Sequence, residues 1–336
     1  MMLLKIVCLK ILYMDRLFFL LTLLLCLFIT AKDGHSDQSD IAPALAHDAK
    51  LIIAKFGERE LAMRQASCQA TFTTTKNSLA NALGVTHDIT VSPPGDAANL
   101  IKASFFKGFS SEGSIKWLMS NLDERFDVNS TQWNDSRREG ASRPNKAENY
   151  YSNGSYIVYK PAVNMARYET HGLIAGEDLP SRPSELFFLK KDDKWISNYL
   201  EDLVNNSKMD HVSLDKSDKE HTQLAFDDSS DSMHPVSWQI LFDDQMHSWP
   251  ISVIEASGKD VLTYEYSEFT QKDGFYYPQV IAYTHQIKLE KSDKLALLQK
   301  SVIRITDMKV DTKSDAKDFD IVNKPGVYFS DPLDGK

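Results

Sequence analysis

The chain has 336 residues with 47 acidic and 38 basic side chains, which gives a formal net charge of −9 at pH 7. Such an acidic balance disfavours a general nucleic-acid binder, because neutralising phosphates requires clustered positive charge. A hydrophobic fraction of 42% and an aromatic fraction of 10% are enough for a sizeable core and argue against global disorder. We therefore expect a folded protein with no nucleic-acid partner.

The N-terminus has the layout of a secretory leader. Arg16 precedes an apolar run over residues 17–29, in which Thr22 is the one hydroxyl-bearing residue, and small and polar residues follow. A charged residue, an apolar run of about 7–15 residues and a short cleavage region make up a signal peptide, whereas spanning a bilayer takes about 20 apolar residues. The sequence predicts a signal peptide and cleavage region over residues 1–36, with Met14 as an alternative start, and a linker over residues 37–43.

The leader places the protein outside the cytoplasm, in the periplasm or cell envelope. An uncleaved N-terminal segment that anchors the protein is the alternative to cleavage. Of the three cysteines, only Cys68 lies beyond this leader, so no disulfide can form within the mature chain. A nucleophilic Cys68 would need a basic residue that activates its thiol, and the sequence nominates none. A buried structural thiol is therefore the favoured interpretation.

The first half of the mature chain is patterned in parts. Apolar residues recur at helical spacing over residues 43–66, which predicts one amphipathic helix. Residues 67–76 alternate and are rich in β-branched side chains, which predicts a strand. Residues 77–104 show little pattern. Residues 120–153 are polar and poor in periodicity, so a long loop or insertion is expected there.

The second half is expected to be mostly strand. Two short strands flank Lys160-Pro161, and Trp195, Tyr199 and Leu203 recur at the spacing of a helix of about three turns. From about residue 210 onward, candidate strands follow one another through short polar turns. Consecutive strands joined by short turns must be antiparallel, so the sequence predicts a meander and excludes a parallel doubly wound sheet there.

One strand of this meander stands out by its length. The stretch "DGFYYPQVIAYTHQIKLE", residues 273–290, alternates apolar and polar side chains over roughly 16 residues, whereas globular strands seldom exceed about 10. Phe275, Tyr277, Ile281 and Tyr283 share one face. A strand so long, with aromatic residues on one side, is expected to form a wall of a large sheet.

Motifs for catalysis or cofactor binding are missing. The chain has no glycine-rich phosphate loop, no GxSxG and no HExxH. Its nine histidines have no companions at metal-ligand spacing, and the acidic run at residues 227–232 lacks the glycine and terminal glutamate of a calcium loop. We expect no catalytic residue, no metal site and no cofactor.

Aromatic residues on the predicted strands are the remaining candidates for a site. They form either an ordinary packed core or the wall of a ligand cavity, since larger curved sheets enclose such cavities. Tyrosine and tryptophan suit a wall that is apolar along its body and polar at its tip. The candidate wall residues are Tyr156, Tyr159, Tyr168, Trp238, Trp249, Tyr264, Tyr266, Phe275, Tyr277, Ile281 and Tyr283.

Three segments carry a resemblance to a known family. They are "VYKPAVNMARYE", "GFYYPQVI" and the C-terminal "SVIRITDMKVDTKSDAKDFDIVNKPGVYFSD". Together with the leader, the helix and the meander, they resemble the LolA/LolB-like bacterial lipoprotein carriers over residues 44–75 and 150–332. The chain departs from that pattern by its extra length at residues 76–150 and by Lys160, where a carrier commonly has arginine.

The resemblance implies a fold that is mainly β with α. It consists of a strongly curved antiparallel sheet, an unclosed half-barrel, whose open side is covered by the N-terminal helix and a short helix. A single domain over residues 44–332 is expected, with the polar insertion at 120–153 inside it.

The resemblance also implies a non-enzymatic, exported protein that binds lipid or the acyl chains of lipoproteins in the half-barrel. An envelope stress sensor or scaffold with the same fold, which has another envelope protein as its partner, is an alternative. A secreted hydrolase whose site has no recognisable motif is a second one.

Overall fold

The computed structural model describes residues 41–77, 108–121, 123–134, 142–152, 156–160, 165–169, 179–191, 194–205, 209–215, 220–228, 235–243, 249–289, 294–319 and 328–330. The predicted signal peptide lies outside these residues. Of the predicted linker, residues 41–43 already belong to the first helix. The chain divides into two compact units after Ala44, and the second unit, Leu45–Lys336, contains the rest of this helix and every described strand.

Helices are few in the described part of the chain. They are α2 (Ile41–Met63), the short α5 (Pro183–Leu186), α6 (Ile196–Asn205) and the 3₁₀ turn η2 (Ala316–Phe319). The predicted helices over residues 43–66 and around Trp195–Leu203 correspond to α2 and α6. No helix within the described ranges combines the length and apolar character needed to span a bilayer.

Strands make up most of the rest. They are β1 (Gln65–Lys76), β2 (Phe109–Ser120), β3 (Asp123–Asn134), β4 (Ser142–Ser152), β5 (Tyr156–Lys160), β6 (Met165–Glu169), β7 (Lys190–Lys191), β8 (Lys194–Trp195), β9 (Met209–Asp215), β10 (His221–Asp228), β11 (Val236–Asp243), β12 (Pro250–Ser257), β13 (Asp260–Lys272), β14 (Phe275–Lys288), β15 (Leu295–Val310) and β16 (Tyr328–Ser330).

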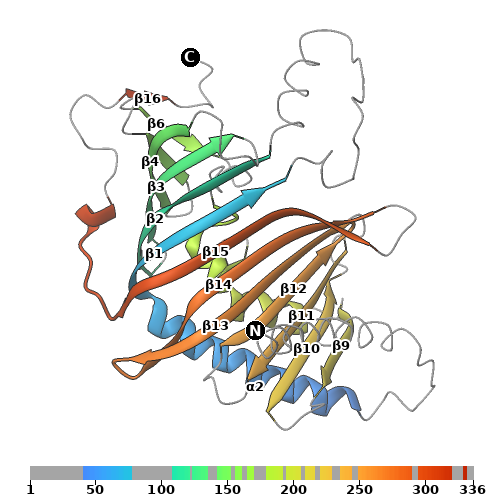
Figure 1. The fold of residues 1–336 in the computed structure, drawn as a ribbon. Coiled ribbons are helices and arrows are strands. Elements are labelled where there is room, and N and C mark those ends of the chain that lie inside the picture. Colours follow the sequence, from blue (N-terminus) through green and yellow to red (C-terminus); the bar gives the residue numbers. More distant parts are fainter. Residues whose placement is uncertain are drawn as a thin grey trace, which may run out of the picture. The chain divides into compact units, whose positions relative to one another are not determined.

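Fourteen of these strands form one sheet in the order β16-β6-β5-β4-β3-β2-β1-β15-β14-β13-β12-β11-β10-β9, and β7 pairs with β8 separately (Figure 1). Every neighbouring pair is antiparallel except β16 with β6. The two ends of the order, β16 and β9, do not pair with each other, so the sheet stays open. The prediction of a mainly β fold built on one unclosed antiparallel sheet, a half-barrel, is confirmed, and β9 to β15 form the predicted meander.

The predicted loop over residues 120–153 was wrong in most of its length. β3 and β4 occupy residues 123–134 and 142–152 and pair with their neighbours along nearly all of their length. The pattern was hidden because the buried side of β3 carries Glu124 and Ser130 beside Phe126 and Val128. A buried polar residue with partners elsewhere in the fold breaks the apolar alternation that marks a strand.

Alternating burial separates the sheet into two faces. On β1, Cys68, Ala70, Phe72 and Thr74 are buried, and the residues between them are half-buried or exposed. The register of the neighbouring strands continues this alternation, so that their buried residues lie on the same side. We call this side the inner face and the opposite side the outer face.

The long strand β14 is matched by its neighbours. β13 has 13 residues, β14 has 14 and β15 has 16, and β14 is paired on both sides. Tyr277, Ile281 and Tyr283 are buried on the inner face. The length of the strand is therefore used to extend a continuous apolar surface across the centre of the sheet.

Two glycines are expected to respond oppositely to alanine. At Gly113 on β2, an added Cβ would lie 2.1 Å from the Asn129 carbonyl oxygen, whereas at Gly57 in α2 it would lie 3.9 Å from the Ser197 Cβ. We expect Gly113→Ala to lower the free energy of unfolding by about 3 kcal/mol, because backbone must shift. Gly57→Ala should raise it by up to about 1 kcal/mol through helix propensity. Chemical denaturation measures both, and a Gly113→Ala variant as stable as wild type would contradict the close packing of β2 on β3.

Candidate functional site

Most of the predicted wall residues come together on the inner face. Trp238, Trp249, Tyr264, Tyr266, Tyr277, Ile281 and Tyr283 are buried in one hydrophobic cluster, and the half-buried Phe275 packs against it. Tyr156 and Tyr159 lie on β5 and Tyr168 lies on β6, but their side chains are outside the described ones. The eight described residues, of which seven are aromatic, belong to one apolar cluster, and their role as a ligand wall stays a prediction.

A segment of the chain itself covers this surface. It consists of residues 179–191 and 194–205, which contain α5, the β7–β8 hairpin and α6, and we call it the plug. The Phe187 ring stacks on Trp117 with a centroid distance of 5.2 Å, and Phe188 lies 6.1 Å from Trp238. Tyr266 Oη donates a hydrogen bond to the Leu186 carbonyl at 3.0 Å. The plug thus fills the space over the inner face with aromatic side chains of its own.

Helix α2 contacts both the plug and the sheet. Phe56 contacts Phe188 of the plug and Phe242 of β11, with ring centroids 5.7 Å and 5.2 Å away. Arg59 donates to the Phe188 carbonyl, and its guanidinium lies 4.7 Å from the centre of the Trp249 ring. Burial lowers the pKa of Arg59 to about 10, so it remains charged at neutral pH.

Two buried glutamates hold the helices of the plug by their N-termini. Glu124 of β3 accepts hydrogen bonds from the backbone N–H of Ser184 in α5 at 2.9 Å and from its hydroxyl at 2.7 Å. Glu60 of α2 accepts from the backbone N–H of Ser197 in α6 at 2.7 Å. The first N–H groups of a helix have no partner inside it, so each carboxylate satisfies a donor that burial would otherwise leave unpaired.

Glu124 and Glu60 are both buried, but their carboxylates have different hydrogen-bond partners. Glu124 is fully buried and accepts a third hydrogen bond from Trp117 Nε1 at 2.8 Å. Burial raises the pKa of Glu60, although the Ser197 hydrogen bonds oppose this change. An ion pair adds a further tie at the other end of the plug, where Lys191 Nζ lies 2.7 Å from Glu255 Oε1 of β12.

The plug and α2 are attached to the sheet differently. Only Arg64 separates α2 from β1, and the Asn121 N–H donates to the Arg64 carbonyl at 2.7 Å while the Thr312 N–H donates to the Gln65 carbonyl at 3.0 Å. The end of α2 is therefore fixed to three strand ends. The plug pairs with no strand of the large sheet in the described residues. Its attachment rests on side chains and single hydrogen bonds.

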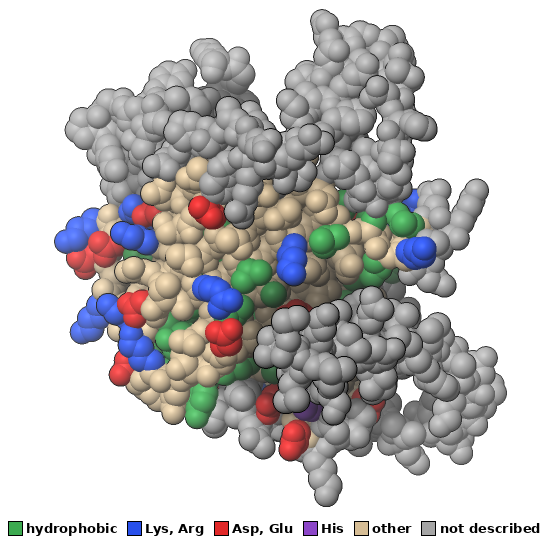
Figure 2. Space-filling view, in the orientation of Figure 1, with side chains coloured by type: hydrophobic (Ala, Val, Ile, Leu, Met, Phe, Trp, Pro, Cys, Tyr) green, Lys and Arg blue, Asp and Glu red, His purple; other side chains and the backbone are tan. Residues whose placement is uncertain are grey.

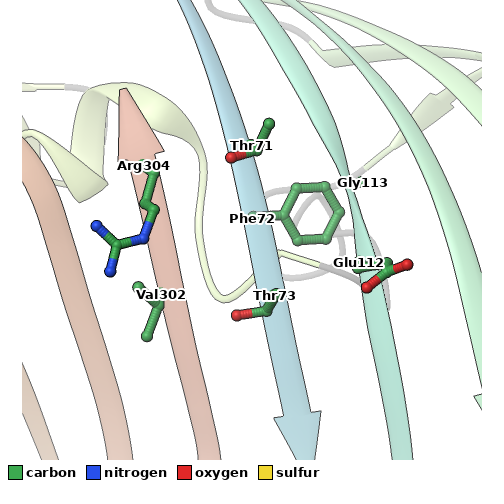
Figure 3. Close-up of a pocket in the computed structure, with 7 residues that line it drawn as sticks. All are labelled: Thr71, Phe72, Thr73, Glu112, Gly113, Val302 and Arg304. Atoms are coloured by element: carbon green, nitrogen blue, oxygen red, sulfur yellow. The ribbon is translucent and has the colours of Figure 1, made fainter. Parts of the chain in front are cut away.

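The outer face carries a pocket of about 360 Å³. Figure 3 shows that its residues come from the neighbouring strands β1, β2 and β15, and they are Thr71, Phe72, Thr73, Glu112, Gly113, Val302 and Arg304. Arg304 also lies 3.6 Å from Glu268, but both side chains are more than half exposed, so this pair contributes little. None of the predicted wall residues lines this pocket.

Charge on the visible surface is mixed. In the view of Figure 2, acidic and basic side chains are interspersed and do not gather into one patch of a single sign.

Cys68, the candidate structural thiol, is buried on the inner face, and burial raises its pKa, which makes it a poor nucleophile. No group of three or more metal-ligating side chains is brought together in the described part of the chain.

The resemblance implied that a short helix covers the open side, and α6 does so with Tyr199 6.1 Å from Trp238, but the rest of the plug was not predicted. Its core is the run Leu186–Leu189, a four-residue apolar stretch next to the predicted helix, and all four residues are buried. That run was a usable signal, since an apolar stretch between charged residues needs a surface to cover. Arg59, Glu60 and Glu124 were not recognisable, because charged residues on a predicted helix or loop usually face solvent.

Comparison with known proteins finds distant structural likenesses. No family model and no curated protein matches the chain. An outer membrane lipoprotein-sorting protein domain from Vibrio parahaemolyticus is 11% identical, over 82% of this chain and 97% of that one, with a TM-score of 0.40. A DUF1329 family protein from Desulfovibrio piger is 10% identical over the same shares, with a TM-score of 0.42.

Proposed function

We propose that this protein is a non-enzymatic binding protein of the cell envelope that takes the acyl chains of lipids or lipoproteins on its inner face. The plug, residues 179–191 and 194–205, is the segment that an acyl chain replaces. The aromatic residues of β11 to β14, together with Trp249, then form the wall of the site.

The observation that carries this proposal is that a large apolar inner face is covered by a short segment that does not belong to the sheet. The apolar surface extends continuously over β10 to β15, β1, β2 and β3, and the plug that covers much of it is a short segment outside the sheet. Phe188 has a backbone φ of +51°, a conformation that bulky residues seldom adopt. The plug contains this strained residue and pairs with no strand of the large sheet in the described residues, so its displacement breaks side-chain contacts and individual hydrogen bonds but leaves the strand pairing intact.

An acyl chain offers contacts that can replace those of the plug. Phe187, Phe188 and Leu189 supply apolar surface to the aromatic residues, and a fatty chain supplies the same kind of surface. Burying one methylene contributes about 0.8 kcal/mol. Shortening a bound chain by two carbons should therefore weaken its affinity by roughly tenfold.

The test combines mass spectrometry of lipids that co-purify with the protein and titration with a fluorescent fatty acid. We expect bound acyl-containing lipid and an affinity that falls with each pair of carbons removed. Tyr283→Ala should reduce this affinity, with Thr284→Ala, on the opposite face of β14, as the matched control. A protein that carries no lipid and binds no fatty acid of any length would refute the proposal.

A further inference from the structure

A row of hydroxyl groups crosses the inner face next to the aromatic surface. The register pairs Tyr264 with Tyr283, Tyr283 with Ser301, Ser301 with Thr74 and Thr74 with Ser111. Five adjacent strands, β13, β14, β15, β1 and β2, thus each place one hydroxyl-bearing residue at the same level. We call these five residues the hydroxyl row. With strands about 4.8 Å apart, the row is roughly 19 Å long.

The row marks a boundary between apolar and charged surroundings. The next level on one side is apolar and includes Tyr266, Ile281, Ile303 and Phe72. On β13, β14, β15 and β1 the next level on the other side consists of Leu262, His285, Gln299 and Lys76. Gln299 donates to Ser301 Oγ at 3.3 Å, and His285 Nε2 lies 2.7 Å from Asp260 Oδ1. Along β14, β15 and β1 the inner face therefore changes from apolar residues through neutral hydroxyls to the polar side chains of His285, Gln299 and Lys76, which is the order of polarity along an amphiphile.

The hydroxyls of this row are neutral and buried. All five residues are at most 9% exposed, and burial raises the pKa of both Tyr264 and Tyr283. The tyrosines therefore keep their protons, and every hydroxyl in the row can both donate and accept a hydrogen bond. A buried phosphate or carboxylate would meet no positive charge within the row itself.

Part of the row's hydrogen-bonding capacity is unused within the described structure. Thr74 Oγ1 and Ser301 Oγ are 2.8 Å apart and satisfy one another. Ser111 Oγ is buried, and no described group forms a hydrogen bond with it. Trp238 Nε1, on β11 and two strands from β13, is in the same situation. Leaving a buried polar group unpaired is costly, so a serine whose hydroxyl has no described protein partner points to a ligand oxygen.

We infer that the hydroxyl row binds the uncharged, oxygen-rich head group of an amphiphile whose acyl chain lies on the aromatic surface. This inference rests on the proposed function. The chemistry is that of ester, glycerol or sugar oxygens, so acylglycerols and alkyl glycosides are the two sources of such a head group. Ser111 is the residue whose role is clearest, since its hydroxyl is the one left for the ligand.

The experiment compares probes with the same fourteen-carbon chain length, fourteen being chosen as a common length, by displacement of a fluorescent fatty acid from the full mature chain. The probes are monomyristoylglycerol, its phosphate monoester and tetradecyl glucoside. We expect a neutral probe to bind about tenfold more tightly than the phosphate, because a buried charge without a partner is disfavoured. The stronger of monomyristoylglycerol and tetradecyl glucoside identifies the source of the head group.

Variants separate a role in binding from a role in folding. Ser111→Ala should lower the affinity for the favoured neutral probe roughly fivefold, the effect of one hydrogen bond, and leave the midpoint of denaturation unchanged or higher. Ser114→Ala, on the outer face of the same strand, should change neither quantity. Equal binding of neutral and phosphate probes, together with an unchanged Ser111→Ala affinity, would overturn the inference while acyl binding stands. Failure of every probe and of the fluorescent fatty acid would refute the proposed function and the inference together.

Discussion

A disulfide between positions 57 and 197 should abolish acyl-chain binding. The double variant Gly57→Cys, Ser197→Cys would join α2 to α6 of the plug. An ideal Cβ at Gly57 lies 3.9 Å from the Ser197 Cβ, within the range of about 3.5–4.5 Å that disulfides require. Because the end of α2 is fixed to the sheet through Arg64, the bond would hold the plug on the inner face.

The measurement is fatty-acid titration of the oxidised and the reduced double variant. We expect the oxidised form to bind at least about a hundredfold more weakly, because an acyl chain that cannot replace the plug leaves most of its methylenes in water. The reduced form should regain the affinity of Ser197→Cys alone. Ser197→Cys is the matched control, because it removes the hydroxyl that Glu60 holds and forms no bond to α2. Full binding by the oxidised variant would show that the plug does not need to leave α2.

Glu124→Ala should be among the most destabilising single changes in the chain. It removes the acceptor of Trp117 Nε1–H, of the Ser184 N–H and of the Ser184 hydroxyl, all in a fully buried setting. Buried donors left without acceptors cost about 1–3 kcal/mol each, so the free energy of unfolding should fall by about 3–5 kcal/mol. Urea denaturation measures the change.

Glu124→Gln is the control for this effect. Its carbonyl oxygen can still accept from one or two of the donors, so a loss of about 1–2 kcal/mol is expected. If the alanine variant is as stable as the glutamine variant, Glu124 does not anchor α5, and the plug is held by its aromatic contacts alone.

Periodicity was a good guide wherever one face of an element is uniformly apolar. The strand around Tyr277 and Tyr283, the meander after residue 210 and the helix that contains Phe56 all follow from alternation or helical spacing. The same reasoning failed at β3, because Glu124 and Ser130 occupy inner positions. Trp117 and Ser184 compensate the burial of Glu124 by hydrogen bonds, and Ser130 also has an interaction partner. A local sequence pattern does not show which residues will be such partners.

The candidate site was likewise predictable only in part from the sequence. The sequence alone determined an antiparallel meander with aromatic residues on one side, because short turns require antiparallel neighbours and period-two patterning fixes which side chains share a face. That the sheet is open was implied by the family resemblance. Only the tertiary structure decided that Leu186–Leu189 of the plug lie on that face, that Glu60 and Glu124 hold the plug, and that five hydroxyl-bearing residues from β13 to β2 fall in one row. Register between strands and the docking of a short segment depend on contacts between residues far apart in the sequence, such as Thr74 and Ser301, which are 227 positions apart. Such contacts are selected by the fit of the whole fold, and no local pattern specifies them.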